Sequence, residues 1–154
     1  MRYFSTAALS LAALLGASSL LHAQGGQRSI WDGVYNAAQA DRGKALFSQN
    51  CTRCHGEALD GRDEIPPLKG AHFMANWEGQ SLADLVQRIR NTMPLDNPGS
   101  LSGVSATDIA AYLMQQNASP AGSAELANDA GVQSTIRIDA VAPSPVAAPA
   151  AAAK

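Results

Sequence analysis

Residues 51–55 read Cys-Thr-Arg-Cys-His, and the interpretation of the whole chain starts from them. Two residues separate the two thiols, and an imidazole follows the second thiol directly. At this spacing two cysteines can form thioether bonds to the vinyl groups of a haem, while the adjacent histidine ligates the iron. Cys51 and Cys54 are also the only cysteines among the 154 residues. The motif therefore predicts one covalently attached haem c on Cys51 and Cys54, with His55 as the proximal iron ligand.

The cysteine pair has two other interpretations. A redox-active disulfide of the thioredoxin type needs a βαβ setting, which the sequence does not show. A zinc site would need Cys51, Cys54, His55 and His72, but structural zinc sites usually repeat a short ligand spacing and His72 stands alone. Both interpretations are therefore weaker than covalent haem attachment.

The N-terminus is typical of an export signal. Arg2 supplies a positive charge, residues 7–15 are apolar and uncharged, and Leu21-His22-Ala23 offers a cleavage site after its last residue. The alternative is an uncleaved anchor, since the uncharged stretch 3–21 approaches the ~20 residues that span a membrane, but its polar residues make it a poor membrane helix. We expect residues 1–23 to be a signal peptide. The mature protein would then be periplasmic and soluble, without stable membrane insertion.

The rest of the chain predicts one small domain with appendages. We assign residues 24–117 to the domain, with its core at about 39–117, and residues 118–140 to a C-terminal extension. Residues 141–154 (VAPSPVAAPAAAAK) are rich in Pro and Ala and are expected to be a disordered tail. The 11 basic and 13 acidic residues nearly balance, which argues against nucleic-acid binding, because that function needs a basic surface.

Apolar spacing predicts three main helices, over residues 39–50, 81–91 and about 106–116. The second is the clearest, because Ser81 and Asp84 suit a capping box in front of a continuous apolar stripe. Sheet patterns are nearly absent, so the fold class is all-α, with three main helices and ordered loops wrapped around the haem.

Local signals also predict where the third helix begins. Ser105 and Asp108 suit a second capping box, and Val104 with Ile109 suits a hydrophobic staple. Residues 134–138, Ser-Thr-Ile-Arg-Ile, are the one strand-like piece of the chain.

Four side chains are candidates for the sixth iron ligand: Met74, Met93, Met114 and His72. Met114 falls within the third helix and suits the core, and Met74 lies among aromatic residues that are placed to line a pocket. Met93 lies between two helices, and Pro94 holds it in an extended conformation from which its thioether can reach the far haem face. We predict Met93 as the distal ligand, with His72 and Met74 as the alternatives, because His/Met ligation is an established cytochrome arrangement.

With these features the chain resembles the class I c-type cytochromes. The likeness covers about residues 39–117 and rests on the haem motif together with Gly-Lys-Ala-Leu-Phe at 43–47, Thr-Met-Pro at 92–94 and Ile-Ala-Ala-Tyr-Leu at 109–113. The wider stretch 29–47 (SIWDGVYNAAQADRGKALF), with PPLKG at 66–70 and FMANW at 73–77, is similar to the small periplasmic cytochromes c that accompany, or are fused to, pyrroloquinoline-quinone (PQQ) alcohol dehydrogenases. The resemblance implies the cytochrome c fold.

The resemblance also implies roles for single residues. His55 would be the proximal ligand and Met93 the distal one. The carbonyl of Pro66 or Pro67 would accept the other ring N–H of His55 and orient the imidazole. Trp77 would donate its indole N–H to a haem propionate, although simple core packing explains this residue equally well.

Two further implications concern packing. Gly43 and Phe47 would pack against Tyr112 and Leu113 where the first and last helices cross. Residues 118–138 would be an appendage of the kind found in the relatives.

The function implied is single-electron transfer rather than catalysis, because an iron with two protein ligands has no open position for substrate. The resemblance implies a periplasmic, PQQ-dependent dehydrogenase as electron donor and a cytochrome or terminal oxidase as acceptor. The alternative is a haem-c enzyme or a gas or redox sensor with a labile sixth ligand. A third hypothesis is a haem subunit that docks on a large dehydrogenase through its appendages.

Overall fold

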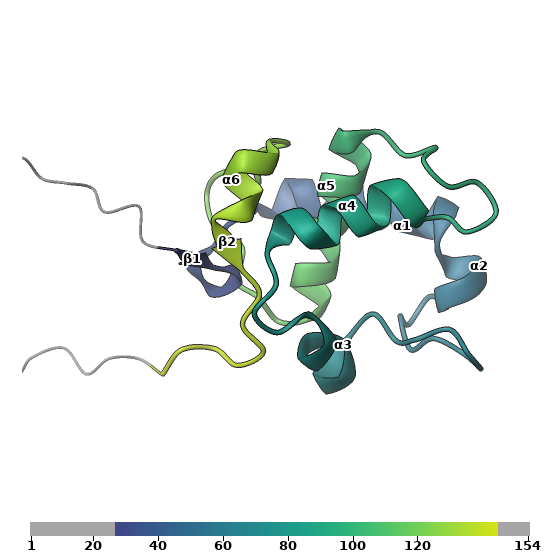
Figure 1. Ribbon diagram of the computed structural model, residues 1–154, viewed down its shortest axis with the longest axis horizontal. Coiled ribbons are helices and arrows are strands. Elements are labelled where there is room, and N and C mark those ends of the chain that lie inside the picture. The colour runs from purple at the N-terminus through teal and green to yellow at the C-terminus, as the bar shows by residue number, and fades with distance from the viewer. Residues whose placement is uncertain (1–26, 145–154) are drawn as a thin grey trace, which may run out of the picture.

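The computed structural model describes residues 27–144, and within that range the chain is mostly helical (Figure 1). In chain order the elements are β1 (Arg28–Ser29), the 3-10 helix η1 (Ile30–Asp32), α1 (Ala37–Asn50), α2 (Thr52–His55), α3 (Gly70–Trp77), α4 (Leu82–Thr92), α5 (Gly103–Gln116), α6 (Ala130–Ser134) and β2 (Ile136–Arg137). The all-α prediction is confirmed. No helix in this part of the chain has the length and apolar character needed to cross a membrane. The expected signal peptide, and most of the expected tail, lie outside the described residues.

The three main predicted helices are α1, α4 and α5. Helix α1 begins two residues before the predicted start, because the side chain of Asn36 accepts a 2.9 Å hydrogen bond from the Gln39 N–H and caps the first turn. Helix α4 has the predicted capping box: Ser81 Oγ accepts from the Asp84 N–H at 3.2 Å, and Asp84 Oδ2 accepts from the Ser81 N–H at 2.9 Å.

The predicted start of the third helix is wrong by one turn. Helix α5 begins at Gly103, because Ser102 Oγ accepts a 3.0 Å hydrogen bond from the Ser105 N–H. Val104 is 54% exposed, so it makes no hydrophobic staple. Asp108 is buried within the helix, and its Oδ2 accepts a 2.9 Å hydrogen bond from Arg42 Nε. It is therefore not a capping residue.

Replacing Ser81 with alanine is expected to lower the free energy of unfolding at neutral pH by about 1 kcal/mol. The hydroxyl and N–H of Ser81 lower the pKa of the Asp84 carboxyl below its ordinary value of 3.8. A lowered folded-state pKa stabilises the protein above the unfolded pKa, and this stabilisation is lost as the pH falls through the folded value. The difference in unfolding free energy between wild type and Ser81→Ala, measured by urea unfolding, should therefore be largest at pH 7 and shrink in acid, where the cap from Ser81 Oγ to the Asp84 N–H remains. Ser100→Ala, in an exposed loop, is the control, and an equal effect there would contradict the role of the cap.

Helices α1 and α5 cross in direct backbone contact. A Cβ added at Gly43 would lie 1.9 Å from the carbonyl oxygen of Asp108 and 2.9 Å from Cβ of Tyr112. Beside this contact the rings of Phe47 and Tyr112 pack with centroids 5.4 Å apart and planes tilted by 55°. The packing of Gly43 and Phe47 against Tyr112 is therefore confirmed, and glycine is required because only a residue without a side chain admits so close an approach.

The C-terminal extension is part of the core. Residues 118–140, here called the C-terminal clasp, bury Leu126, Ile136 and Ile138 against the helices. The side-chain amide of Gln39 on α1 is buried and makes two hydrogen bonds to the backbone of Leu126. It donates to the Leu126 carbonyl at 3.0 Å and accepts from the Leu126 N–H at 2.7 Å. Of the strand-like piece predicted at 134–138, only Ile136–Arg137 form a strand, β2, which pairs in parallel with β1, while Ser134 ends α6.

The clasp closes over the N-terminal segment. The hydroxyl of Tyr35 donates to the Ser119 carbonyl at 2.6 Å, and Ser119 Oγ donates to the Ile30 carbonyl at 2.6 Å. The two chain segments touch at Gly33 and Gly122, where a Cβ on Gly122 would lie 2.0 Å from the Gly33 carbonyl oxygen. The segment before α1 and the segment after α5 therefore fold as one unit.

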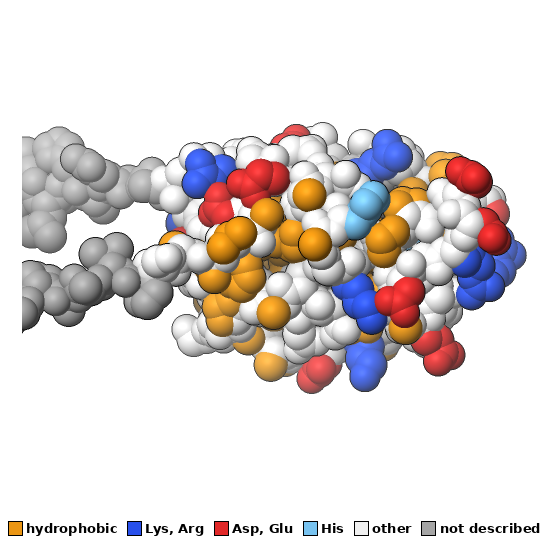
Figure 2. All heavy atoms as spheres, turned by 90° about the horizontal axis from the view of Figure 1, so that it is seen from below, with side chains coloured by type: hydrophobic (Ala, Val, Ile, Leu, Met, Phe, Trp, Pro, Cys, Tyr) orange, Lys and Arg blue, Asp and Glu red, His pale blue; other side chains and the backbone are white. Residues whose placement is uncertain are grey.

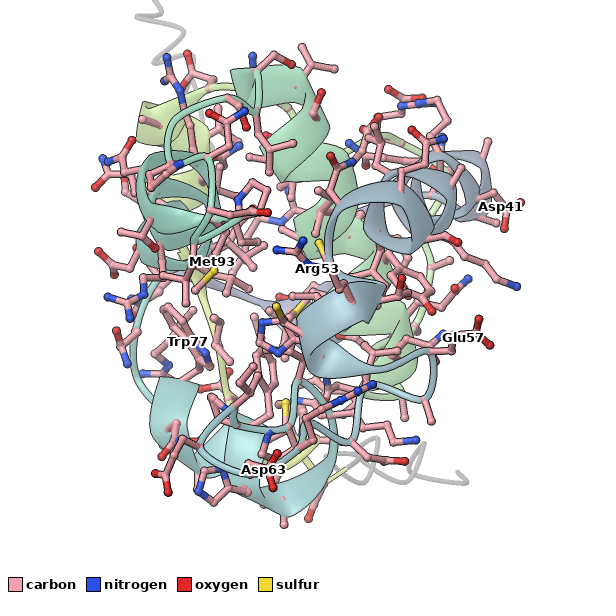
Figure 3. The ribbon with its side chains drawn as sticks, turned by 90° about the vertical axis from the view of Figure 1, so that its right-hand side faces the viewer. Asp41, Arg53, Glu57, Asp63, Trp77 and Met93 are labelled. Carbon is pink, nitrogen blue, oxygen red and sulfur yellow. The ribbon has the colours of Figure 1, made fainter. Side chains whose placement is uncertain are left out.

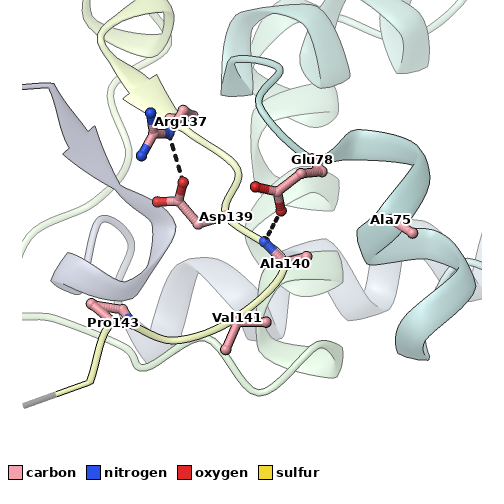
Figure 4. A pocket seen from close by; sticks show the side chains of 7 residues that line it. All are labelled: Ala75, Glu78, Arg137, Asp139, Ala140, Val141 and Pro143. Carbon is pink, nitrogen blue, oxygen red and sulfur yellow. Dashed lines mark hydrogen bonds and ion pairs between the residues drawn. The ribbon is translucent and has the colours of Figure 1, made fainter.

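Beyond β2 the chain runs against α3 (Figure 4). The N–H of Ala140 donates to the Glu78 carboxylate, and Arg137 Nε lies 2.6 Å from Asp139 Oδ1. Trp31 Nε1 donates to the Asp139 carbonyl at 2.9 Å, which ties the same stretch to η1. Figure 2 shows both acidic and basic side chains on one face, in agreement with the balanced composition, together with a broad group of hydrophobic side chains.

Candidate functional site

The motif at 51–55 lies at the junction of α1 and α2. The N–H of Cys51 still bonds to the Phe47 carbonyl at 2.8 Å, while its own carbonyl accepts from the N–H groups of Cys54 at 3.1 Å and His55 at 2.9 Å. This single turn brings both thiols and the imidazole to one cavity of about 630 Å³. Pockets of about 300–1,000 Å³ are typical of cofactor sites.

The cavity lies between α2, α3 and α4, with α5 at its base. Its apolar wall is formed by Phe47, Ile65, Pro66, Pro67, Leu68, Phe73, Trp77, Leu85, Ile89, Met93, Pro94, Leu95, Ile109 and Leu113. The other side chains on the wall, apart from the motif, are polar or charged, namely Asn50, Glu64, Asn76, Gln80, Asp84 and Arg88. A largely apolar site with a few polar groups suits a flat hydrophobic cofactor that carries charged substituents.

The imidazole of His55 is oriented by one backbone carbonyl. Its Nδ1 lies 3.2 Å from the Pro66 oxygen. Because a carbonyl oxygen can only accept, Nδ1 carries the proton and Nε2 keeps its lone pair for a metal. Burial lowers the pKa of His55, and the bond to Pro66 opposes this to a lesser extent. The carbonyl that orients the ring is thus that of Pro66, while Pro67, the other proline named from the sequence, contributes to the cavity wall.

The two cysteines are free thiols. Burial raises the pKa of the Cys51 thiol to about 11, with a smaller contribution from the neighbouring Cys54 thiol. Redox-active thiols in Cys-x-x-Cys motifs have lowered pKa values instead. The environment of Cys51 therefore disfavours the thioredoxin-type interpretation.

The structure separates the four candidates for the sixth ligand. Met93 lies on the cavity wall. Its backbone is extended, at φ −119° and ψ 149°, as expected for a residue before proline. Met74 and Met114 are buried in the core and are not on that wall. His72 lies on the exposed surface of α3, where its Nδ1 is 3.2 Å from Asn76 Nδ2.

Figure 3 shows the side of the molecule on which α2, Trp77 and Met93 lie. Met93 and Trp77 lie on one side of the view, and α2, which carries Arg53, lies on the other. Trp77 is half-buried, and its ring packs against Phe73 with centroids 6.3 Å apart. Trp77 therefore has a packing role beside Phe73, and its hydrogen bond to a haem propionate stays a prediction.

The residues at the cavity fit haem c. Two thiols and an imidazole with a free Nε2 share one helical turn, a thioether lies elsewhere on the wall, and the intervening surface is apolar. In contrast, within residues 27–144 no three His, Cys, Asp or Glu side chains come together as a metal site. The zinc interpretation therefore has no structural support in this part of the chain.

Two arginines lie near the site. Arg53, inside the motif, is exposed and is not on the cavity wall; it pairs with Asp96 at 2.5 Å and so links α2 to the loop after Met93. Sequence reasoning did not predict that the side chain of Arg88 on α4 contributes to the cavity wall. The available signal was its position beside the apolar stripe of α4, one turn after Asp84.

Comparison with known proteins agrees with this chemistry. Residues 38–113, which include the haem motif and Met93, match the family described as cytochrome c oxidase, cbb3-type, subunit III. Cytochrome c6 from Synechocystis sp. is 36% identical over 83 residues, a match that covers 52% of this chain and 68% of that protein.

Two dehydrogenases show more limited similarity. Thiosulfate dehydrogenase from Stutzerimonas stutzeri is 32% identical over 79 residues, which are 47% of this chain and 25% of the relative. The crystal structure of the sulfane dehydrogenase SoxCD from Paracoccus pantotrophus has 23% sequence identity and a TM-score of 0.42, over 58% of this chain and 53% of that one. This chain thus spans a quarter of the first protein and about half of the second.

The family match and the cytochrome c6 match confirm the cytochrome c fold and the covalently bound haem c that the motif predicts. The chain belongs to the class I c-type cytochromes, which carry single electrons on that haem.

Proposed function

We propose that this cytochrome is an exported periplasmic carrier whose iron is ligated by His55 and Met93. The observation that carries the proposal is the position of Met93: of the four candidate side chains it is the one on the wall of the cavity that His55 faces. Bound haem c supplies an iron that gains and loses one electron. His55 and Met93 would hold that iron and leave it no open position for substrate, and a thioether ligand would favour the ferrous state and raise the potential.

The chain supports fast exchange by keeping its ligands fixed. The Pro66 carbonyl holds the His55 ring, and the Met93 N–H is anchored to the Ile89 carbonyl at 3.1 Å. Ligands that stay bound in both redox states keep the reorganisation small. Cys51 and Cys54 are only partly buried. The edge of the haem that is bonded to these two cysteines, here called the thioether edge, would therefore lie close to the protein surface beside α2. We assign electron exchange to this edge.

The donor in this proposal is a periplasmic dehydrogenase, and the acceptor is a cytochrome or terminal oxidase. Similarity to cytochromes that accompany PQQ-dependent alcohol dehydrogenases supports a quinoprotein donor. The partial match to thiosulfate dehydrogenase supports a second donor class. Stopped-flow reduction by a purified quinoprotein alcohol dehydrogenase and by a thiosulfate dehydrogenase would distinguish them. Equal, slow rates with both, no faster than with an unrelated dehydrogenase, would reject the proposed donors.

The proposal includes the division of the chain into a signal peptide at 1–23, a cytochrome domain at 24–117, and the extension and tail that follow. Export in a bacterial host with haem-maturation machinery tests the first boundary. The intact mass of the mature holoprotein should correspond to a chain beginning at Gln24 plus one haem. A mass that includes residues 1–23 would show an uncleaved anchor.

Replacing Met93 with alanine is expected to open the iron. The oxidised wild-type protein should show the weak far-red band of a methionine thioether on ferric haem, and Met93→Ala should lose it and bind carbon monoxide when reduced. Met74→Ala and Met114→Ala remove core thioethers and are the controls, and both should keep the band. If wild type lacks the band and binds carbon monoxide, the site is open, and the haem-c enzyme or sensor replaces the carrier as the favoured function.

A further inference from the structure

The carbonyl that orients His55 belongs to a segment with few anchors of its own. Pro66 and Pro67 have no backbone N–H, so neither residue can donate a hydrogen bond that fixes its position. The nearest backbone donors on either side are Ile65 and Leu68, and both donate to carbonyls of the same loop. The position of the Pro66 carbonyl therefore depends on what holds this loop to the rest of the protein.

That loop, residues 56–69 between α2 and α3, is hydrogen-bonded mostly to itself and to α2. Its backbone bonds join Leu59 to Gly56, Leu68 to Leu59, Arg62 to Ile65, Gly61 to His55 and Gly56 to Thr52. The ion pair between Lys69 and Asp60, at 3.1 Å, also lies within it. Outside α2 and α3, Asn117 is the one described residue that forms a hydrogen bond with the loop.

Asn117, the residue that follows α5, holds the end of this loop at two points. Its Nδ2 donates to the Leu68 carbonyl at 3.1 Å, and its Oδ1 accepts from the Gly70 N–H at 2.9 Å. The same Nδ2 donates to the Leu113 carbonyl at 2.8 Å, which fixes the amide on α5. Asn117 is only 8% exposed. One buried amide thus ties the chain, two residues after the Pro66 carbonyl, to the helix at the base of the cavity.

We infer that Asn117 is a positioning residue for the proximal ligand, because it holds the Pro66 carbonyl where that oxygen accepts from the His55 Nδ1–H. The inference rests on the proposed ligation of haem iron by His55. Two consecutive prolines have fixed φ angles, so a movement at Leu68 is passed on to Pro66 rather than absorbed between them. The bond to Pro66 orients the imidazole and raises its basicity. Asn117 is not on the cavity wall, so it acts on the iron through His55.

The exchange of the His55 Nδ1–H with water tests this role. In the reduced holoprotein the low-spin iron is diamagnetic, so this proton can be followed by nuclear magnetic resonance. Asn117→Ala should speed its exchange about tenfold relative to wild type, because a weakened hydrogen bond leaves the proton unprotected more often. A less basic imidazole stabilises ferric iron less, so the midpoint potential should rise as well. An unchanged exchange rate would overturn the inference, whatever the effect on stability.

Gln39→Ala is the matched control. Gln39 is also a buried amide that bonds to both the carbonyl and the N–H of a distant segment, at Leu126, and it is not on the cavity wall. This variant should melt at a lower temperature than wild type, as Asn117→Ala should, but leave the His55 exchange rate and the midpoint potential unchanged. Equal acceleration of exchange in both variants would show a general effect of destabilisation and reject the role of Asn117.

Failure of the proposed function would look different. Covalent haem stoichiometry and the far-red thioether band are measured first, and their absence from wild type would reject the haem ligation, and the inference with it. If Asn117→Ala does not accumulate, Asn117→Asp takes its place at pH 7. An ionised carboxylate still accepts from the Gly70 N–H but cannot donate to the Leu68 carbonyl. Faster His55 exchange in this variant would support the inference, and wild-type exchange would overturn it.

Discussion

Deletion of residues 118–154 is expected to abolish the folded cytochrome, whereas deletion of residues 145–154 is expected to leave its melting temperature unchanged. The larger deletion removes the C-terminal clasp with the buried side chains of Leu126, Ile136 and Ile138. Full burial of such side chains contributes about 1.5–3 kcal/mol each, so roughly 5–9 kcal/mol is lost. The net stability of a domain is only about 5–15 kcal/mol.

Broken hydrogen bonds add to this loss. Without the clasp, the buried amide of Gln39 loses both bonds to Leu126, and the hydroxyl of Tyr35 loses the Ser119 carbonyl. Buried polar groups without partners destabilise by about 1–3 kcal/mol each unless water reaches them. The measurement is the yield of covalently bound haem together with thermal melting by circular dichroism. A truncated protein that ends at Asn117 and melts at the wild-type temperature would contradict the prediction.

This result would also change how docking through the appendages is tested. A deletion that unfolds the domain says nothing about partner binding. Exposed residues of the clasp, such as Val132 at 42% exposure, can be changed without disturbing its buried side. Co-purification of a dehydrogenase with Val132→Glu, compared with wild type, would test the docking hypothesis on a folded protein.

Replacement of Gly43 with alanine is expected to destabilise the protein strongly, against the usual trend for a helix interior. Alanine in a helix is favoured over glycine by about 1 kcal/mol. Here, however, the added methyl would lie 1.9 Å from the Asp108 carbonyl oxygen and 2.6 Å from its carbon. Both are backbone atoms, so α1 and α5 must move apart. Overpacking of this kind typically costs about 1–3 kcal/mol and occasionally more.

Gly103 provides a matched control for that substitution. It also lies in a helix, but a Cβ there would meet the side-chain oxygen of Asn128 at 2.8 Å, and that side chain can turn away. Gly103→Ala should therefore change the melting temperature much less than Gly43→Ala. If the two variants melt at the same temperature, the crossing of α1 and α5 is looser than the contact at Gly43 indicates.

The elements that the sequence predicted correctly are those with local signals. The haem motif is five consecutive residues, and α4 has both a capping box and an apolar stripe within eleven residues. Helix α3 was missed because its cap comes from elsewhere in the chain. Lys69, at its N-cap, makes no side-chain capping bond, and Asn117 at the end of α5 accepts from the Gly70 N–H at 2.9 Å. Such a tertiary cap has no pattern in the local sequence.

Long-range pairing also explains the error at the start of α5. Ser105 and Asp108 have the spacing of a capping box, yet Asp108 is buried and bonds to Arg42, which in turn bonds to Glu125 of the clasp. For the site, the positions of His55 and Met93 followed from linear motifs. That Arg88 contributes to the cavity wall, while the Asp84 carboxylate is held by Ser81, is visible only in three dimensions.

The pairing of β1 with β2 has a practical consequence for wiring this cytochrome to an electrode. Both outer ends of the described chain lie on the side of these strands, and α2 lies at the opposite end of the molecule (Figure 1). A peptide linker to a gold or carbon surface, added at either end, would leave α2 and its thioether edge facing the solution. An immobilised film built in this way should exchange electrons with a dissolved redox partner whichever end carries the linker.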